Sequence, residues 1–521
     1  QDVAGIHRIV TAIRTSLPQC FYLQDRSRDG DVATSEAIFV YTGSSPSVSE
    51  GDEVLVDGSV SEFRYDEAHL SMTRIEGPTV VVSTTGNALP TPIVLGNGGR
   101  VPPDQVIDDD VNGTVETSGT FDATSDGIDF YESLEAMLVQ VNGPIAVSGT
   151  SYGTIAVVGD DGAYAGDFTP RGGLVVQPGD YNPERIIVSE GLESVPTIDT
   201  GVAFNGPITG VIDYDDYNGN FNLLHIEPLP VATGGVVSET TTTAGEDTLR
   251  VATFNVYNLD PGDSAARFDG LAAQIVINMG APDIIGLQEI QDNNGTIDDG
   301  TVDASQTYAA LIQAIEDAGG PTYDYRDIAP ENNQDGGVPG GNIRVGFLFR
   351  TDRGVSFVDR PGGDATTAVT ATLGSGGVEL SASPGRIDPT DPAFDEGRKS
   401  LVGEFTYNGH TLFVVVNHLK SKSQDTGLFG RYQPPVLNTE AQRLAQAQAV
   451  NGFVDHVLSL DPEANVIVLG DLNDFQFSPP LQTLEGDDLT NLAYTVPITE
   501  QYTYIYNGNS QALDHILVSD N

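Results

Sequence analysis

Hydrophobic residues in the first part of the chain occur in short runs that are separated by polar turns. Three such runs occupy residues 37–41, 53–57 and 80–82. No helical period persists across this region, so the pattern predicts a small β-barrel over residues 1–100. Similar runs at 136–141 and 210–214 predict a second β-rich domain over 101–236, folded as a barrel or a sandwich.

The pattern changes after a polar linker, which we place at 237–248. Strand-like apolar runs then alternate with helical stretches. The strands lie at 249–254, 283–288 and 466–469, and the helices at 267–279, 304–318 and 438–460. This alternation is typical of an α/β domain, predicted here over 249–521. The predicted fold class is therefore a multidomain chain with all-β modules ahead of an α/β domain.

Four apolar strands of the predicted α/β domain end in polar residues. The endings contain Asn255, Glu289, Asn417 with His418, and Asp471 with Asn473. Taken singly, an Asp after a strand is more often a turn former or a helix cap, and a lone His is more often structural. Ligand sites of open α/β sheets are assembled at strand ends. Four such endings in one domain therefore predict a site.

Composition adds an extreme charge balance. The 521 residues include 75 Asp and Glu against 23 Lys and Arg, a formal net charge of −52. The only lysines are Lys399, Lys420 and Lys422, and they cluster around the Asn417-His418 ending. High salt screens such self-repulsion, so we read the composition as adaptation to a saline medium. Ordinary acidity of a secreted protein is the alternative.

Two further features limit the class of protein. Cys20 is the only cysteine, which excludes an intrachain disulfide. No apolar run approaches 18 residues, so the sequence predicts no transmembrane helix.

The polar strand ends suit hydrolysis of a phosphodiester. Mg²⁺ or Mn²⁺ would take oxygen ligands, with Glu289 as the principal one and Asn255 nearby, directly or through water. Asp471 can orient or deprotonate the attacking water while Asn473 holds a phosphate oxygen. His418 can donate a hydrogen bond to the scissile phosphate.

Five ordered motifs resemble those of the endonuclease/exonuclease/phosphatase superfamily. They are Phe254-Asn255, Gly286-Leu-Gln-Glu289, Asn417-His-Leu-Lys420, Gly470-Asp-Leu-Asn473 and Leu513-Asp-His515. The chain is most similar to large secreted microbial nucleases that carry β-rich modules ahead of a domain like pancreatic deoxyribonuclease. Residues 21–25 and 37–42 resemble the OB-type module of such nucleases, although we find no basic-aromatic stripe on it.

The resemblance implies a four-layer α/β sandwich and a role for each matching residue. Asn255 and Glu289 would bind metal, and Asn417 and Lys420 would bind phosphate or substrate. The catalytic residues would be His418, which binds the phosphate, Asp471, Asn473 and Asp514. Arg398 matches a phosphate-contacting arginine, with a solvated loop arginine as the alternative. Asn342 occupies a position that often holds a polar partner of the site.

The chain departs from the family pattern at its end. The family usually adds a Ser-Asp-His motif after the strand that contains Asp514, whereas this sequence stops at Asn521. We expect that the last strand is missing and that hydrolysis by this polypeptide is impaired. Alternatively, Asp514 and His515 are themselves the paired Asp and His.

The predicted function is a secreted, metal-dependent nuclease that hydrolyses DNA, with RNA as a second candidate substrate. One rival is a phosphodiesterase or phosphatase acting on small phosphoesters or lipid headgroups. The other is a non-catalytic binding protein with a vestigial nuclease domain. Acidic loops at 108–110 and 213–216 are candidate Ca²⁺ sites, although such loops are usually only solvated. We expect no membrane association and infer no protein partner.

Overall fold

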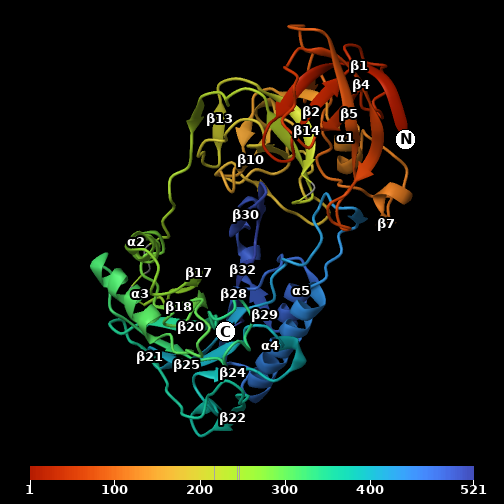
Figure 1. Ribbon diagram of the computed structural model, residues 1–521. Helices are drawn as coiled ribbons and strands as arrows, with labels where there is room; N and C mark the ends of the chain where they lie inside the picture. Colours follow the sequence, from red (N-terminus) through yellow and green to blue (C-terminus); the bar gives the residue numbers. More distant parts are fainter. Residues whose placement is uncertain (216, 243–244, 246, 521) are drawn as a thin grey trace. The chain divides into compact units, whose positions relative to one another are not determined.

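The chain forms two compact units (Figure 1). The computed structural model describes residues 1–215, 217–242, 245 and 247–520. Asp216 of the second candidate Ca²⁺ loop lies outside these ranges, as do Thr243, Ala244 and Glu246 of the predicted linker. The first unit comprises Gln1–Val236, Asp425–Val436 and Ile498–Gln511, and the second comprises Val237–Gln424, Leu437–Pro497 and Ala512–Asn521.

The first unit begins with a closed five-stranded barrel of order β1-β2-β3-β5-β4. Its strands are β1 (Asp2–Arg14), β2 (Cys20–Gln24), β3 (Ala37–Tyr41), β4 (Glu53–Phe63) and β5 (Met72–Thr84). β1 pairs with β4 to close the barrel, and β3 runs parallel to β5. Alternate apolar residues such as Val10, Leu23 and Val54 fill the interior, as the period-2 pattern requires.

A nine-stranded sheet follows, with order β16-β13-β9-β10-β12-β15-β14-β8-β6. Its strands are β6 (Ile93–Leu95), β8 (Leu138–Val141), β9 (Ile145–Ala146), β10 (Thr154–Val158), β12 (Ile186–Ser189), β13 (Val202–Phe204), β14 (Ile208–Asp215), β15 (Asn220–His225) and β16 (Ala232–Gly234). The short helix α1 (Gly127–Glu132) packs with it. One hydrophobic cluster joins Tyr22 and Phe39 of the barrel to Leu138 and Val211 of the sheet. The predicted division at residue 100 stays a prediction.

Two segments from the range predicted for the third domain belong to the first unit. In one, β27 (Tyr432–Gln433) pairs with β7 (Gly113–Thr114). In the other, β30 (Tyr504–Tyr506) and β31 (Asn509–Gln511) form a hairpin, and β31 pairs in parallel with β11 (Leu174–Val175). The buried Arg185 also donates a hydrogen bond to the carbonyl of Asn507. Such long-range pairing leaves no local signal in the sequence.

The second unit contains two sheets. The smaller has the order β17-β18-β20-β19. Its strands are β17 (Val251–Leu259), β18 (Ile284–Ile290), β19 (Tyr323–Asp327) and β20 (Arg344–Arg350). The larger has the order β21-β25-β26-β28-β32-β29, with β24 paired to β25. Its strands are β21 (Val355–Phe357), β24 (Gly385–Arg386), β25 (Leu401–Tyr407), β26 (His410–His418), β28 (Asn465–Asp471), β29 (Leu489–Asn491) and β32 (Asp514–Ser519).

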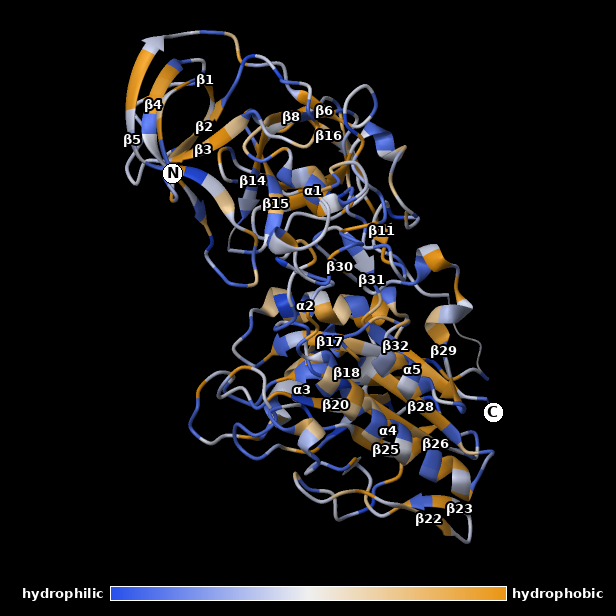
Figure 2. Cartoon of the chain, turned by 90° about the vertical axis from the view of Figure 1, so that its right-hand side faces the viewer, coloured by the Kyte–Doolittle hydropathy of each residue, from blue (hydrophilic) through white to orange (hydrophobic). Residues whose placement is uncertain are grey.

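Helices cover the outer face of each sheet of this unit. They are α2 (Ala265–Ala273) and α3 (Ser305–Asp317) on the smaller sheet, and α4 (Glu440–Leu460) and α5 (Pro479–Glu485) on the larger. A hairpin of β22 (Ala371–Gly374) and β23 (Gly377–Leu380) packs with α4. Helix–sheet–sheet–helix stacking gives the four layers expected. Figure 2 shows apolar residues concentrated on the strands. Among the described residues, no helix has the length and hydropathy needed to cross a membrane.

Successive side chains along a strand point to opposite faces of the sheet, so each sheet can pack against helices on one face and against the other sheet on the other face. On β18, Leu287 packs toward α2 and α3, whereas Ile284 packs between the sheets with Val416 and Leu469 of the other sheet. The two sheets approach closely at Gly286, where an added Cβ would lie 2.2 Å from Leu469 Cδ1. Strands buried on both faces require the near-continuous apolar runs seen in the sequence.

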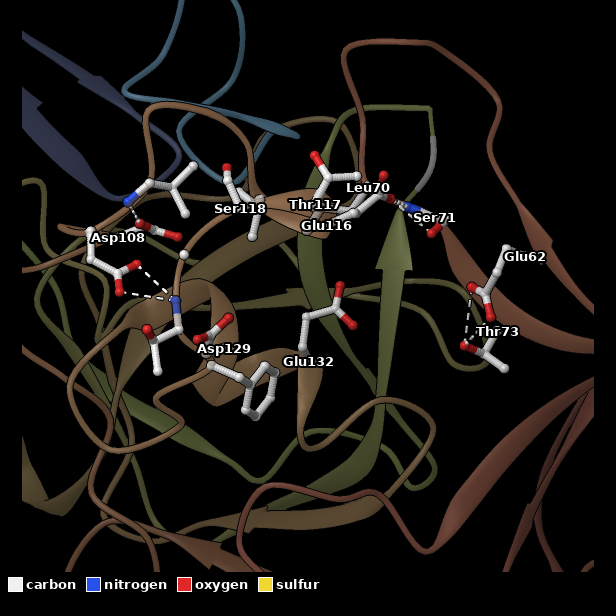
Figure 3. A pocket seen from close by; sticks show the side chains of 16 residues that line it. Glu62, Leu70, Ser71, Thr73, Asp108, Glu116, Thr117, Ser118, Asp129 and Glu132 are labelled. Carbon is white, nitrogen blue, oxygen red and sulfur yellow. Dashed lines mark hydrogen bonds between the residues drawn. The ribbon is translucent and has the colours of Figure 1, made fainter.

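The first unit contains a cavity of about 400 Å³ with an acidic lining (Figure 3). Its carboxyl groups come from Glu62, Asp108, Asp110, Glu116, Asp129 and Glu132. The candidate Ca²⁺ loop at 108–110 borders it, but no three His, Cys, Asp or Glu side chains in the described ranges are arranged to hold a metal ion. Burial, together with the charges of Asp129, Glu116 and Glu62, raises the pKa of Glu132 to about 8.

We predict that Glu132 makes the first unit less stable in alkaline solution. Because its pKa in the folded state lies above the ordinary value of 4.5, its contribution to stability is full below about pH 4.5 and is lost as pH rises through about 8. Glu132→Gln cannot ionise, so its Tm should exceed that of the wild type by about 2–4 °C at pH 9, as about 1 kcal/mol produces in a unit of this size. The two proteins should melt within about 1 °C of each other at pH 5.

Thermal unfolding followed by circular dichroism in high salt measures both values. The exposed Glu463→Gln is the matched control and should melt like the wild type at both pH values. An equal difference between Glu132→Gln and wild type at pH 5 and pH 9 would contradict the prediction.

Candidate active site

The predicted polar strand ends meet at one edge of the two sheets of the second unit. β17 and β18 run in parallel with Asn255 opposite Gln288, so Asn255 and Glu289 lie at adjacent strand ends. β26 and β28 are also parallel, with His418 opposite Asp471. Asp514 begins the antiparallel neighbour β32 directly across from Asp471. Parallel pairing thus aligns the strand ends within each sheet, and the antiparallel β32 adds Asp514 at its first residue.

The Asn255 amide joins the carboxylates of the two sheets. Its Nδ2 donates hydrogen bonds to Glu289 Oε1 at 3.0 Å and to Asp471 Oδ2 at 3.1 Å. Its Oδ1 accepts a hydrogen bond from the backbone N–H of Tyr257 at 2.8 Å, which fixes the orientation of the amide. Asn255 thus faces the carboxylates as a donor while its oxygen is engaged by the backbone. Its predicted role as a metal ligand stays a prediction.

His418 lies against the same two carboxylates. Its Nε2 is 3.8 Å from Glu289 Oε1 and 3.7 Å from Asp471 Oδ2, too long for direct hydrogen bonds. Its buried Nδ1 has no hydrogen-bond partner in the described part of the chain. Burial, with a smaller contribution from the positive charge of Arg398, holds the pKa of His418 well below its usual range. The imidazole is therefore neutral at pH 7.

Asp471 is a carboxylate of this edge whose pKa is raised. Burial, reinforced by the charge of Asp514, raises its pKa to about 7. Hydrogen bonds from Asn255 and from the backbone N–H of Asn473 act in the opposite direction but are weaker. A carboxyl group poised near neutrality can accept a proton from water, which is the property a general base requires.

Arg398 is buried at this site rather than solvated. Its side chain is 8% exposed, and one guanidinium nitrogen donates to the carbonyl of Leu419 at 2.7 Å. Its Nε has no hydrogen-bond partner among the residues described. Burial lowers its pKa, while the charges of Asp471 and Glu289 favour its charged form. The reading of Arg398 as a solvated loop arginine is wrong.

The three lysines have different environments. Lys399 Nζ donates to the carbonyls of Phe394 and Gly397 at 2.6 and 2.9 Å and lies 3.5 Å from Asp335, so this half-buried lysine holds a loop. Lys422 pairs with Asp474 at 3.3 Å. Lys420 is half-buried two residues after His418. Only Lys420 and Lys422 therefore remain candidates for contact with substrate.

Backbone conformation positions several of these groups. Glu289 has φ 63° and Asn473 has φ 53°, a region that non-glycine residues seldom adopt and that is found at functional sites.

The side-chain amides of Asn473 and Asn417 contact backbone carbonyls. Asn473 Nδ2 donates to the Leu419 carbonyl at 3.1 Å, and the phosphate-binding role of Asn473 stays a prediction. Asn417 Nδ2 donates to the Leu469 carbonyl at 3.2 Å, and its buried Oδ1 has no partner within the described ranges.

Two residues considered from the sequence lie apart from this arrangement. His515 is buried, with Nε2 2.9 Å from the carbonyl of Asp474 and Nδ1 3.2 Å from Asn491 Nδ2. Those contacts are structural, which argues against His515 as the partner of Asp514. Asn342 instead donates to Asp292 at 2.8 Å in a separate buried network.

Sequence reasoning missed the buried pair of Arg443 and Asp474. Arg443 Nε on α4 donates to Asp474 Oδ2 at 2.7 Å, and the side chains are 0% and 2% exposed. Asp474 directly follows Asn473 in the motif that was recognised, and this adjacency is the only signal the sequence offers. The ion pair ties the loop after β28 to the helix.

The donor set suits a hard divalent cation held mainly by Glu289. Glu289 Oε2 is buried and lacks a hydrogen-bond partner among described residues, while Oε1 lies beside the carboxylate of Asp471. Oxygen donors of this kind, with waters, are what Mg²⁺ prefers. The described residues contain no ready-made group of three His, Cys, Asp or Glu ligands. Waters or substrate oxygens would have to complete the coordination.

Comparison with known families agrees with this geometry. Residues 252–521 match the model of the Endonuclease/Exonuclease/phosphatase family, which covers more than half of the chain. The chain belongs to this family. Its members are hydrolases that act on phosphoesters and typically use divalent metals. Residues 94–233 match a second model, Domain of unknown function (DUF8508). No curated protein matches the sequence.

Three solved structures that are similar to this chain have names that describe different proteins. One is an endonuclease/exonuclease/phosphatase from Bacteroides vulgatus, with 18% identity, 52% of this chain and 87% of that one covered, and a TM-score of 0.32. Another is D. rerio TDP2 complexed with single-strand DNA product, with 17% identity, 52% and 83% of the two chains covered, and a TM-score of 0.31. The third is the Bacteroides thetaiotaomicron mannosyl-6-phosphatase Bt3783, with 17% identity, 53% and 86% of the two chains covered, and a TM-score of 0.30. Likenesses this distant carry no argument for one substrate.

We predict that Gly470→Ala disrupts the site of this phosphoesterase-family domain. Gly470 has φ 145°, and a Cβ there would lie 2.0 Å from the carbonyl oxygen of Asn417 on the paired strand. Separation of β28 from β26 would move Asp471 relative to His418. Phosphodiester hydrolysis should fall by about 100-fold or more, since a 1 Å misplacement costs about that factor, and the Tm should also fall.

Hydrolysis of plasmid DNA and thermal unfolding measure the two effects. Gly452→Ala on α4 is the matched control, because a Cβ there meets no atom within 4 Å. Full activity of Gly470→Ala would show that the strand contact does not position the site.

Proposed function

We propose that the protein is a metal-dependent nuclease that hydrolyses phosphodiester bonds of DNA. The observation that carries this proposal is the cluster of Glu289, His418 and Asp471, held together by the Asn255 amide. A neutral donor beside two carboxylates, one of them with a pKa near 7, provides the groups that attack of water on phosphorus requires. The intact cluster argues against a vestigial, purely binding domain.

Each residue has a role that its surroundings support. Glu289 would hold the divalent cation, and that ion, when bound, neutralises charge on the phosphoryl oxygens. Asp471 accepts the proton of the attacking water. His418 donates a hydrogen bond to a phosphoryl oxygen, which a neutral imidazole can do through the nitrogen that carries its proton. The charge of Arg398, which burial leaves weakly screened, favours the anion at the same edge.

A protein with this net negative charge would repel DNA unless salt screens the repulsion, so a DNA substrate fits a saline medium. Affinity for nucleic acids normally comes from Lys and Arg, and that electrostatic contribution weakens as salt increases. A nuclease adapted to high salt would depend on the metal, hydrogen bonds and a few local cations instead. We therefore propose Mg²⁺ or Mn²⁺ as the cofactor, with Ca²⁺ as an additional candidate, and an extracellular location in salt. RNA remains a second candidate substrate.

We also propose that the five-stranded barrel is of the OB type. The closed strand order with β1 against β4, and β3 parallel to β5, supports this assignment. The barrel also carries one basic residue packed against aromatic rings. Arg74 lies over the rings of Phe63 and Tyr41, at 3.7 and 4.8 Å from their centroids.

We predict that Glu289→Ala and His418→Ala each lose at least about 100-fold in cleavage of plasmid DNA with Mg²⁺ or Mn²⁺. Glu289→Ala removes the main ligand of the cation, and His418→Ala removes a hydrogen-bond donor to the phosphate. Rates are measured at increasing salt on agarose gels, with the exposed Glu463→Gln as the unchanged control. Parallel assays on p-nitrophenyl phosphate and inositol phosphates address the rival phosphatase function. Unchanged DNA cleavage by both variants would refute the site, and faster turnover of the small phosphoesters would favour the rival.

A further inference from the structure

The first unit contains another cavity, of about 460 Å³, which is bordered by the five-stranded barrel and by strands of the nine-stranded sheet. Pockets that bind small ligands measure roughly 300–1,000 Å³. On the sheet side, Asp213 and Asp215 lie two residues apart on β14 and therefore point to the same face. Asn222 of β15 is directly opposite Asp213. Strand register thus places three polar side chains side by side along this cavity.

The barrel side of the cavity is already packed. The guanidinium carbon of Arg74 lies 3.7 Å from the ring centroid of Phe63 and 4.8 Å from that of Tyr41. Its Nε donates to Glu76 Oε1 at 2.8 Å. The charge of Arg74 is therefore matched within the barrel, and its side chain covers part of the two rings that it contacts.

Two other tyrosines that border the cavity have ring surface open to solvent. Tyr65 and Tyr217 are 64% and 71% exposed. Their ring centroids are 5.8 Å apart with planes inclined by 55°, so the two rings are not stacked face to face. Within the part of the chain that the structure describes, neither ring has a second aromatic neighbour or a cation over it, and neither belongs to the core cluster of this unit. Core packing therefore does not explain them.

A hydrogen bond fixes the start of the turn that carries one of these rings. The backbone N–H of Tyr217 donates to Asp215 Oδ1 at 3.1 Å, and Asn218 Nδ2 donates to Asp215 Oδ2 at 2.7 Å. The turn is thereby tied to the same strand that supplies the polar side chains. A ring that is positioned before binding costs less ordering entropy when a ligand packs on it.

The charges that border the cavity cancel. Among the described residues of its lining, Arg14 and Arg74 are positive and Asp213 and Asp215 are negative. Arg14 Nη1 lies 3.7 Å from Asp213 Oδ2, and Arg74 is bound to Glu76. A polyanion would meet two carboxylates and arginines that are already paired, whereas a cation would meet the arginines. In a chain with net charge −52, such a lining favours an uncharged polar ligand.

An uncharged ligand with an apolar face and many hydroxyl groups is a sugar in its pyranose form. The C–H face of such a sugar packs on an exposed aromatic ring through dispersion contacts. Its hydroxyl groups need donors and acceptors, which Asp215, Asn222 and Ser189 of the lining provide. Contacts of both kinds act at short range and are not weakened by salt as charge attraction is.

We propose that the cavity bordered by Tyr65, Tyr217, Asp213, Asp215 and Asn222 binds a neutral oligosaccharide. The two tyrosine rings pack on sugar faces, and the polar side chains of β14 and β15 bind the hydroxyl groups. This site is separate from the residues that carry the proposed phosphodiester hydrolysis and does not rest on that function. Its role would be to hold the enzyme on a polysaccharide by contacts that remain effective in high salt.

Isothermal titration calorimetry of the full chain in about 1 M NaCl tests the site, because salt at that concentration suppresses long-range charge effects. The probes are cellohexaose, chitohexaose, maltohexaose and mannohexaose. At least one should bind with a Kd of about 1 mM or lower. Tyr65→Ala/Tyr217→Ala should raise that Kd about 10-fold or more, because both ring contacts are removed. Tyr65→Phe/Tyr217→Phe keeps both rings and should bind within about threefold of the wild type.

Two controls separate a lost contact from lost folding. Tyr152→Ala removes an aromatic side chain that is 94% exposed in the same unit and should leave binding unchanged. The Tm of Tyr65→Ala/Tyr217→Ala should stay within about 2 °C of the wild-type value, since both side chains are exposed.

Three results would overturn the proposal. The first is no binding of any of the four hexasaccharides. The second is equal affinity of the wild type and Tyr65→Ala/Tyr217→Ala for the sugar that binds. The third uses hexathymidylate as a fifth probe: if it binds to the wild type, is lost in the double alanine variant and no sugar binds, the cavity belongs to single-stranded nucleic acid instead.

Discussion

The site depends on one amide that holds two carboxylates of different sheets together. Asn255 Nδ2 bridges Glu289 and Asp471, and its oxygen is fixed by the backbone of Tyr257. Without that donor the two carboxylates would repel each other at the edge where the sheets meet, and neither desolvation nor His418 would compensate. The bridge can exist only because the sheets approach closely at Gly286 and because β28 lies tight against Asn417 at Gly470. The absence of a side chain at Gly286 and Gly470 therefore allows the packing that the arrangement of the carboxylates requires.

Much of this arrangement could be predicted from the sequence, because its signals are local. Apolar runs that end in Asn255, Glu289, His418 and Asp471 identify strand ends, and parallel pairing then brings those ends together. Alternation of strands and helices likewise predicted the layers of the second unit. Arg398 could be named from a motif, but its burial depends on contacts with Leu419 that only folding creates.

Other features depend on long-range contacts that leave no local pattern. Nothing near Asn507 or Asn509 indicates that this segment pairs with β11 and Arg185 in the first unit. His515 looks like a catalytic partner of Asp514 in the sequence, yet its buried ring contacts the carbonyl of Asp474. The basic–aromatic cluster on the barrel is assembled from Tyr41, Phe63 and Arg74, which lie on three strands and so form no stripe in the sequence. In each of these examples the contacts of the residue are set by segments far away in the sequence.

The scarcity of cations constrains how such a protein can hold a polyanion. Of the lysines near the site, Lys399 is committed to carbonyls of its own loop, and Lys422 is tied to Asp474. Their clustering therefore reflects loop architecture as much as attraction for phosphate. In concentrated salt a solvated ammonium gains little from a distant phosphate, because the Debye length is about 3 Å at 1 M. Short-range contacts are not screened in this way, which favours metal ligation and hydrogen bonding over long-range charge. Rigid loops next to His418 and Asp471 are consequently a better means of recognition for this chain than a basic surface would be.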